Sequence, residues 1–359
     1  MKRQLFRAAA VLFAAAFFTT LVSAKENYSA RYYVLMDGDT GEILCGKGIH
    51  EQALIASTTK IMTAMLAIEN LDPNMLFVVP AQAVGIEGSS VYLREGEQIT
   101  VKELLYGLML HSGNDAAVAL ALAVDGSVKD FVFRMNLKAQ ELGMSHTHFD
   151  NPNGLDSKSH YSTAHDLAVL TREALRNSAF REVVGEKEIT IGSRSFRNHN
   201  RLLWMGDGIL GVKTGYTRAA GRILVSAACR KGRTLIAVTI CDGNDWVDHL
   251  NLYEQGFSLY DSRCLINKGQ VLCHVPLMDG SLTALRAGES VYYASREDEM
   301  PIIKLSYPQV SLTPQGTAIA HVYLGNLKIK TLKLEWEDTD YGTNPKNHSF
   351  SGTVLPKDC

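Results

Sequence analysis

The sequence predicts an α+β fold, in which an antiparallel sheet and a helical segment are followed by a smaller all-β domain. Three observations lead to this class. Strand-like patterns lie near residues 30–46 and 208–241, and the long segment between them carries helical periodicity. After about residue 264 the helical pattern disappears and only short strand-like runs follow. We therefore expect a first domain over residues 25–262 and a β-rich domain over 263–359.

The first predicted element is a β-hairpin. Aromatic and aliphatic residues over 31–36 lead into the Asp- and Gly-rich stretch 37–41, and a second apolar run follows at 42–45. Asp and Gly are typical turn residues between two strands. This pattern predicts two antiparallel strands joined by a short turn.

Helices are predicted next. Residues 60–70 carry apolar side chains at the spacing of a buried helix, which Asp72 and Pro73 end. The same pattern predicts helices over 101–110, 115–122, 131–142 and 163–177. A break at Ser112-Gly113 separates the second helix from the third, and the polar loop 150–156 precedes the last one.

Three successive antiparallel strands are predicted near the end of the first domain, over 208–216, 222–229 and 234–241, because Ile, Val and Leu are frequent there. If Lys231-Gly232 forms a two-residue turn, Cys229 faces Thr234 and a disulfide to Cys241 is disfavoured. The β-rich domain has strand-like runs at 290–293 and 318–324.

The N-terminus reads as a secretory signal peptide. Basic residues within 1–7 precede an apolar run over 8–21, and small residues at 22–24 predict cleavage after Ala24. Retention of the segment as a membrane anchor is the alternative. The tail 341–359 contains two prolines and two glycines and predicts no amphipathic helix for a membrane surface.

Charge and cysteine content exclude several functions. Removal of residues 1–24 takes away three basic residues and no acid, so the net charge moves from −2 to −5 and gives no reason to bind nucleic acid. The six cysteines contain no CxxC pair, so we do not expect them to bind a metal ion. Four histidines in the middle of the chain lack a zinc signature, so we expect them to be solvated or capping residues: His146, His148, His160 and His165. The sequence predicts no metal and no cofactor.

A Ser-x-x-Lys motif, Ser57 to Lys60, stands where a helix is predicted to begin. Residues three apart on a helix lie one turn apart on the same face, so the amine of Lys60 can reach the hydroxyl of Ser57. A serine hydroxyl needs a neighbouring base to act as a nucleophile. Lysine is a base only if its pKa is lowered, which burial and the nearby cation Lys213 would do. Read alone, the motif is more typical of a surface helix, with Ser57 as its N-cap and Lys60 as a solvated side chain.

Two further motifs complete the pattern. Ser112 and Asn114 lie in the break between two helices, where side chains can project into a cleft. Lys213, Thr214 and Gly215 lie on a predicted strand, and a glycine there lets a substrate backbone come close. Read alone, the motif with Ser112 and Asn114 is typical of a capped turn, and the motif with Lys213 is typical of a lysine on an edge strand.

Together these motifs resemble the signature of penicillin-binding proteins and serine β-lactamases. The chain is most similar to the D-alanyl-D-alanine carboxypeptidases among the low-molecular-mass penicillin-binding proteins. Four stretches carry the resemblance in addition to the motifs, over 56–64, 150–155, 161–166 and 211–215. It covers about residues 28–260 and implies a β-lactamase/transpeptidase-like domain with an antiparallel sheet and a helical subdomain.

The resemblance implies a catalytic group of three residues. Ser57 would be the nucleophile that forms an acyl-enzyme, Lys60 its general base, and Ser112 a proton relay toward the leaving amine.

It also implies a substrate-binding group. Asn114 would contact a substrate amide, and Lys213 and Thr214 would hold the terminal carboxylate along the strand that contains Gly215. The backbone N–H groups of Ser57 and Tyr216 would form the oxyanion hole.

The implied reaction removes the terminal D-alanine of peptidoglycan stem pentapeptides, with β-lactam antibiotics as covalent inhibitors. The implied location is outside the cytoplasm, in the cell wall or on the outer face of the cytoplasmic membrane. A DD-endopeptidase, a transpeptidase and a β-lactamase use the same residues and stay open, although no Glu-x-x-Leu-Asn segment lies between the second and third motifs. A non-catalytic cell-wall-binding protein is the alternative of another class.

Overall fold

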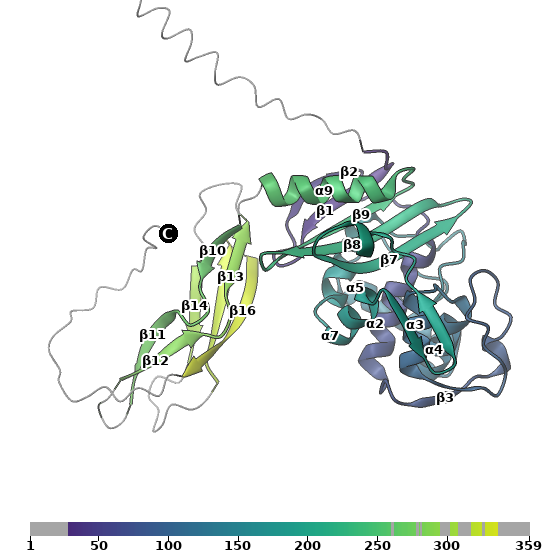
Figure 1. Ribbon diagram of the computed structural model, residues 1–359, viewed down its shortest axis with the longest axis horizontal. Coiled ribbons are helices and arrows are strands. Elements are labelled where there is room, and N and C mark those ends of the chain that lie inside the picture. The colour runs from purple at the N-terminus through teal and green to yellow at the C-terminus, as the bar shows by residue number, and fades with distance from the viewer. Residues whose placement is uncertain are drawn as a thin grey trace, which may run out of the picture.

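The computed structural model describes residues 28–259, 262–277, 280, 282–294, 302–307, 317–324 and 327–336. The predicted signal segment 1–24, the tail 341–359 and Cys359 lie outside these residues. Figure 1 shows a larger body in which helices pack on a sheet and a smaller body made of strands. The predicted α+β class, with a β domain at the C-terminal end, is confirmed.

Five antiparallel strands form the main sheet, in the order β2-β1-β9-β8-β7. Their bounds are Tyr32–Asp37 (β1), Ile43–Lys47 (β2), Ile209–Thr217 (β7), Gly221–Arg230 (β8) and Arg233–Ile240 (β9). The predicted N-terminal hairpin pairs with the last of these strands, and Tyr32 lies opposite Ile240. The three predicted successive strands are β7, β8 and β9, and β7 forms the edge of the sheet.

The turn between β8 and β9 is the predicted Lys231-Gly232 pair. Both residues have positive φ, 50° and 79°, which is the pattern of the tight turn that suits twisted antiparallel strands. Cys229 lies opposite Thr234. Cys229 and Cys241 are both free thiols, as the predicted register requires.

Helices cover both faces of the sheet (Figure 1). One face is covered by Lys60–Asn70 (α2), Ala164–Ala174 (α6) and Ser178–Gly185 (α7), and Val101–Met109 (α3), Asn114–Asp125 (α4) and Val128–Glu141 (α5) pack against α2. The opposite face carries Asp245–Leu259 (α9). α9 was not predicted, although its buried side chains Leu252 and Tyr253 pack with Leu235 of β9.

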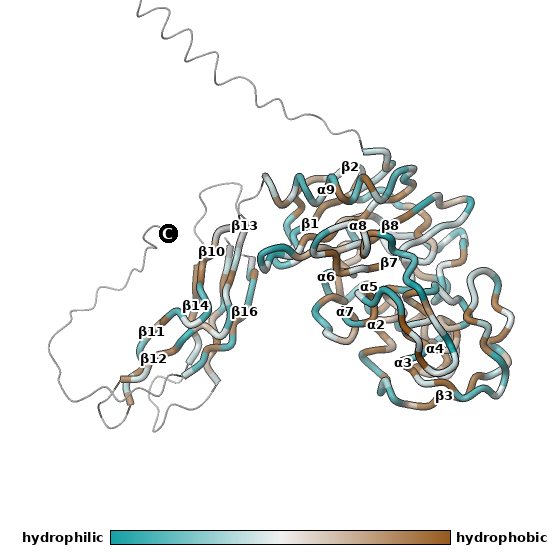
Figure 2. Tube along the Cα trace, in the orientation of Figure 1, coloured by the Kyte–Doolittle hydropathy of each residue, from teal (hydrophilic) through white to brown (hydrophobic). Residues whose placement is uncertain are grey.

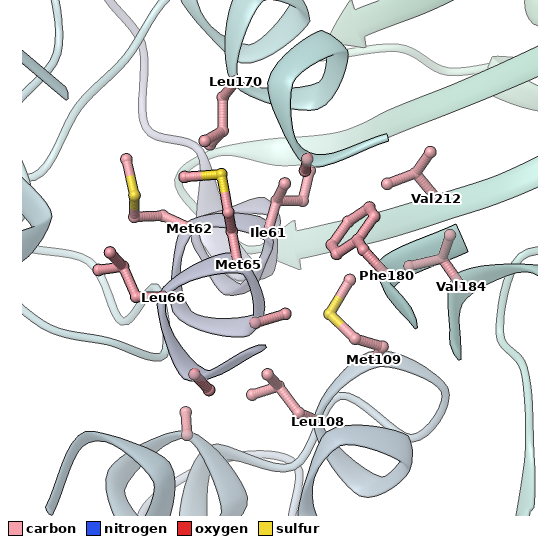
Figure 3. Close-up of a cluster of buried hydrophobic side chains, with 14 of the residues drawn as sticks. Ile61, Met62, Met65, Leu66, Leu108, Met109, Leu170, Phe180, Val184 and Val212 are labelled. Carbon is pink, nitrogen blue, oxygen red and sulfur yellow. The ribbon is translucent and has the colours of Figure 1, made fainter. Parts of the chain in front are cut away.

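The largest core lies between the main sheet and the helices around α2. Figure 3 shows Ile61 and Met65 of α2 among side chains from α3, α7 and β7, including Met109, Phe180 and Val212. Residues 60–67 of α2 are all buried, which explains why apolar residues dominate its sequence. A helix buried in this way holds its first turn in a fixed place.

Side-chain caps set the helix boundaries. Thr100 and Glu103 form a reciprocal capping box that starts α3. The predicted helix over 163–177 ends earlier, at Ala174, and this prediction was wrong at its C-terminal end. The reason is that the side chain of Asn177 accepts a hydrogen bond from the backbone N–H of Ala179 at 2.9 Å and so starts a new helix, α7.

Short elements that the sequence did not predict connect the longer ones. They are Leu76–Val78 (β3), Ala81–Ala83 (η2), Gln98–Thr100 (β4), Glu188–Ile191 (β5), Arg194–Arg197 (β6) and Leu202–Met205 (α8). Each spans three or four residues, which is too short for a periodic pattern. β3 pairs with β4 and β5 pairs with β6.

The C-terminal strands are Ser262–Ile266 (β10), Val271–Pro276 (β11), Leu282–Ala287 (β12), Val291–Ala294 (β13), Ile302–Ser306 (β14), Ile319–Leu324 (β15) and Leu327–Trp336 (β16). Five of them form a sheet in the order β11-β12-β16-β15-β14, and β10 pairs with β13. The two predicted strand-like runs fall on β13 and β15. These strands bury their own apolar cluster, which includes Leu285 and Leu332.

Hydropathy along the described helices follows the packing. Figure 2 shows hydrophobic and hydrophilic residues alternating along α9, as expected of a helix with one buried face. In the part of the chain that the structure describes, no helix combines the length and the apolar character needed to cross a bilayer.

Candidate active site

The Ser57 turn lies between the edge strand and α2. Ser57 belongs to a short 3-10 helix, Ala56–Thr59 (η1), that runs directly into α2. Ala56 has a positive φ of 46°, which is uncommon for a residue with a side chain. Ser57 makes no capping hydrogen bond to either helix. The simpler reading of this serine as a helix cap is therefore wrong.

Lys60 is fully buried, and its amine lies within hydrogen-bond distance of three oxygens. The distances from Nζ are 2.9 Å to Ser57 Oγ, 2.7 Å to Asn114 Oδ1 and 2.5 Å to the backbone oxygen of Asn153. The amide and carbonyl oxygens can only accept hydrogen bonds. A neutral amine would use both of its hydrogens on them, which leaves its lone pair directed at the hydroxyl of Ser57.

The surroundings of Lys60 favour this neutral form. Burial lowers the pKa of Lys60 well below its usual value, and the positive charge of Lys213 lowers it further, while Asp115 acts in the opposite direction. These are the two causes that the sequence predicted. The Lys60 amine is therefore neutral more readily than the amine of an exposed lysine, and is better able to accept a proton.

Ser112 and Asn114 occupy the predicted break between α3 and α4. Ser112 is buried and has a positive φ of 65°, so the chain turns sharply there. Asn114 is the first residue of α4, and its Nδ2 donates to the backbone oxygen of Glu87 at 2.6 Å. Both ends of the Asn114 amide are thus held, one by Lys60 and the other by the 84–93 loop.

Asp115 ties this 84–93 loop to the start of α4. Its carboxylate accepts hydrogen bonds from the hydroxyl of Ser90 at 2.6 Å and from the backbone N–H groups of Val91 and Leu93 at 3.0 and 3.1 Å. Asp115 is only 1% exposed. The sequence analysis did not single it out, although it follows directly after the second motif.

Lys213 is buried on β7, with its Nζ donating to the backbone oxygen of Thr214 at 2.9 Å. Burial lowers the pKa of Lys213 to about 7. At Gly215 an added Cβ would lie 3.2 Å from the backbone oxygen of Ile55 and 3.3 Å from the backbone nitrogen of Ser57. Gly215 thus makes room for the Ser57 turn, whereas the sequence analysis expected it to make room for a substrate backbone.

One cavity of about 480 Å³ gathers the predicted residues. It is lined by Ser57, Ser112, Thr214, Gly215 and Tyr216. The remaining three predicted residues are 5% exposed or less and are buried behind it: Lys60, Asn114 and Lys213. All eight residues therefore converge on one place, the cleft between β7 and the helices.

The same cavity contains side chains that the motifs did not predict, among them Ser89, His199, Arg222 and Trp246. The Nε of Arg222 donates to Asp245 at 3.1 Å, and its guanidinium lies 5.6 Å from the centre of the Trp246 ring. Arg222 lies directly opposite Tyr216 in the β7–β8 pair. A tight connection between these two strands was the signal that could have placed Arg222 at the cleft.

His160 lies on the buried side of the Ser57 turn and contacts Thr59. Its Nε2 lies 2.7 Å from the hydroxyl of Thr59, and its Nδ1 accepts a hydrogen bond from the backbone N–H of Asp150. Burial lowers the pKa of His160 to about 4, so the ring is neutral. The sequence analysis expected a solvated or capping histidine here, which is wrong because the ring is buried between two loops.

Comparison with known proteins decides the family. A sequence profile described as D-alanyl-D-alanine carboxypeptidase (Peptidase S11) matches residues 19–244. The chain belongs to this family. The D-alanyl-D-alanine carboxypeptidase DacF of Bacillus subtilis (strain 168) is 35% identical over 268 residues, which are 70% of this chain and 68% of DacF.

Longer matches extend the comparison over the β domain. DacD of Salmonella typhimurium, a D-alanyl-D-alanine carboxypeptidase, is 35% identical over 355 residues, 92% of this chain and 90% of that protein. The crystal structure of penicillin binding protein 5 from Haemophilus influenzae superposes with a TM-score of 0.65 at 26% identity, covering 86% of this chain and 97% of that one. The protein is thus a serine D-alanyl-D-alanine carboxypeptidase of peptidoglycan, a cell-wall polymer outside the cytoplasm.

Proposed function

We propose that Ser57 is the nucleophile of this carboxypeptidase and Lys60 its general base. The observation that carries the proposal is the environment of the Lys60 amine, which has two pure acceptors and the Ser57 hydroxyl around it. The proton of Ser57 moves to Lys60 as Oγ attacks the carbonyl carbon between the two D-alanines. The chemistry needs no metal or cofactor.

Breakdown of the tetrahedral intermediate releases D-alanine. The C–N bond breaks, and Ser112 passes a proton from Lys60 to the leaving amine. Water then hydrolyses the ester on Ser57 and returns the free enzyme. The position of Ser112 on the same cavity as Ser57 supports this role.

Backbone N–H groups stabilise the developing oxyanion. The proposed donors are the N–H groups of Ser57 and Tyr216, and each donor of this kind is typically worth about 10² to 10³ in rate. Gly215 supports the assignment, because the absence of its Cβ lets β7 approach the Ser57 turn closely.

Binding groups orient the stem peptide along β7. Lys213 and the hydroxyl of Thr214 hold the terminal carboxylate, and Asn114 contacts a substrate amide. The amide nitrogen of Asn114 has two hydrogens, of which one reaches Glu87, so the second serves the substrate.

We also propose the partners and the location of the enzyme. Penicillin and other β-lactams acylate Ser57 and act as covalent inhibitors. The chain is exported with residues 1–24 as a cleaved signal peptide, or with that segment retained as an anchor in the outer face of the cytoplasmic membrane. Residues 25–262 form the catalytic domain and 263–359 the β-rich domain, in agreement with their separate apolar clusters.

Labelling with a fluorescent penicillin tests the nucleophile. Wild type is expected to carry a long-lived adduct, whereas Ser57→Ala carries none and releases no D-alanine from a pentapeptide. Ser178→Ala is the matched control, because Ser178 is an exposed serine at the start of α7. Undiminished release of D-alanine by Ser57→Ala would remove the mechanism, and rapid loss of the adduct in wild type would favour a β-lactamase.

A further inference from the structure

Three histidines from separate segments gather on one surface of the first domain. His50 follows β2, His146 lies in the loop after α5, and His165 is in the first turn of α6. The ring of His50 is the common neighbour, with its centre 4.7 Å from that of His165 and 5.7 Å from that of His146. We call the three residues the histidine cluster. None of them lines the catalytic cavity, so the reaction described above does not use them.

The spacing of these rings is that of imidazoles bound to one metal ion. Zinc binds an imidazole nitrogen at about 2.0 to 2.1 Å and arranges its ligands in a tetrahedron, which places the centres of two bound rings about 5 Å apart. The two observed separations, 4.7 and 5.7 Å, lie on either side of this value. The planes of the neighbouring rings are tilted by 51° and 41° and are not stacked in parallel.

A buried carboxylate holds two members of the histidine cluster. Asp166 is 1% exposed, and one of its oxygens accepts hydrogen bonds from the backbone N–H of His146 at 3.0 Å and from the hydroxyl of Thr147 at 2.8 Å. The other oxygen lies 3.0 Å from Nδ1 of His165. Nδ1 therefore donates its hydrogen to this carboxylate, and the lone pair of the His165 ring is on Nε2. Metal-binding histidines commonly have such a carboxylate behind them, because it fixes the ring and makes it a better ligand.

The backbone places His50 beside His165. The N–H of His165 donates to the carbonyl oxygen of Ile49 at 2.9 Å, which ties the segment after β2 to α6. In the part of the chain that the structure describes, no three ligands already surround one point. Binding therefore requires the rings of His50 and His146 to turn about their side-chain bonds. Both residues are exposed, and exposed side chains make such turns within nanoseconds.

We propose that His50, His146 and His165 together bind one zinc ion. Water completes the coordination, and Asp166 is the carboxylate behind His165. Imidazole nitrogen suits zinc, whereas calcium and magnesium prefer oxygen ligands. The sequence analysis expected no metal because these histidines are far apart in the chain and form no contiguous zinc motif. The site is separate from the role of Ser57 and does not depend on it.

Bound zinc joins segments that lead to the catalytic serine. The chain runs on from His50 to Ala53, which pairs with Ser162 just before α6, and then to Ser57. An ion that binds the folded chain and not the unfolded one stabilises the fold. We therefore expect zinc to raise the Tm of the enzyme.

Titration of the metal-free full-length chain with zinc chloride tests the site. The chain carries no histidine tag, and calorimetry is expected to give one zinc ion per chain. His50→Ala removes the central ring and should weaken binding at least about tenfold, the equivalent of about 1.4 kcal/mol. His148→Ala is the matched control, because His148 is an exposed histidine in the same loop as His146, and it should leave the affinity unchanged. Penicillin acylation within about twofold of wild type shows that each variant is folded.

Asp166→Asn tests the carboxylate behind His165 and is expected to weaken zinc binding about 10- to 100-fold. Its Tm without zinc shows whether the fold itself has changed. If Asp166→Asn does not fold, His50→Ala still decides the proposal, since the His50 ring is exposed.

Three results would overturn the zinc site. The first is no zinc binding by wild type. The second is undiminished binding by His50→Ala, because the ion would then bind other histidines, such as His111 and His199, whose ring centres are 5.4 Å apart. The third is an equal loss of affinity in His50→Ala and His148→Ala, because zinc would then bind exposed imidazoles without preference.

Discussion

The two walls of the catalytic cleft are built differently, although each contains a buried lysine. We call them the helical wall, formed by η1, α2 and α4, and the strand wall, formed by β7. On the helical wall, the amine of Lys60 contacts three oxygens from three separate segments. On the strand wall, Lys213 donates to one backbone oxygen of its own strand, and Gly215 brings the backbone close to Ser57. In the proposed mechanism the helical wall handles the proton of Ser57, whereas the strand wall, next to Ser57, acts through the position of its backbone.

The largest expected effect comes from the helical wall. Lys60→Met keeps a side chain of similar length and removes the base, so acylation by penicillin is expected to fall about 10³-fold. Stopped-flow measurement of acylation checks this value, and circular dichroism shows that the variant is folded. Acylation within tenfold of wild type would mean that another group takes the proton of Ser57.

A substitution at Asn114, on the helical wall, should change how the acylation rate depends on pH. Asn114→Asp places a carboxylate next to Lys60, which stabilises the ammonium form and raises the pKa of Lys60. Because the neutral amine is the active form, the rise of the acylation rate with pH should move to higher pH by about one unit or more. The measurement is the acylation rate from pH 5 to 10. A lower rate with an unchanged midpoint would contradict the assignment of Lys60 as the titrating base.

Gly215→Ala tests whether the close approach of the β7 backbone to the Ser57 turn matters for the rate. The added methyl would lie 3.2 to 3.3 Å from Ile55, Ala56 and Ser57, so β7 must move a few tenths of an ångström away from the oxyanion site. We expect kcat/KM for a pentapeptide to fall about tenfold, since a donor that is slightly misplaced loses part of its contribution. An unchanged rate would show that the spacing between β7 and the Ser57 turn is not critical.

The neighbouring Tyr216→Ala should have the smallest effect. Its side chain is 65% exposed, and only its backbone N–H belongs to the proposed oxyanion hole. We expect kcat/KM to change less than about threefold, which steady-state kinetics on the same pentapeptide would measure. A loss larger than that of Gly215→Ala would reverse the conclusion that the strand wall acts through its backbone.

The sequence predicted the elements whose cause is local. α2 begins and ends at the predicted residues, and all eight predicted site residues converge on one cleft, because short-range spacing and turn residues determine these features. By contrast, Arg222 belongs to no motif and reaches the cleft through its pairing opposite Tyr216 across the short β7–β8 connection, and α9 packs against β1, β8 and β9. Tertiary contacts of this kind leave no periodic signal in the sequence.

Asp115 connects the 84–93 loop at the cleft to the start of α4. Its carboxylate fastens the 84–93 loop, which contributes Ser89 to the cavity, to the same helix start that presents Asn114 to Lys60. The loop and the residue that contacts Lys60 are therefore fastened to the same helix start, so a displacement of either should displace the other.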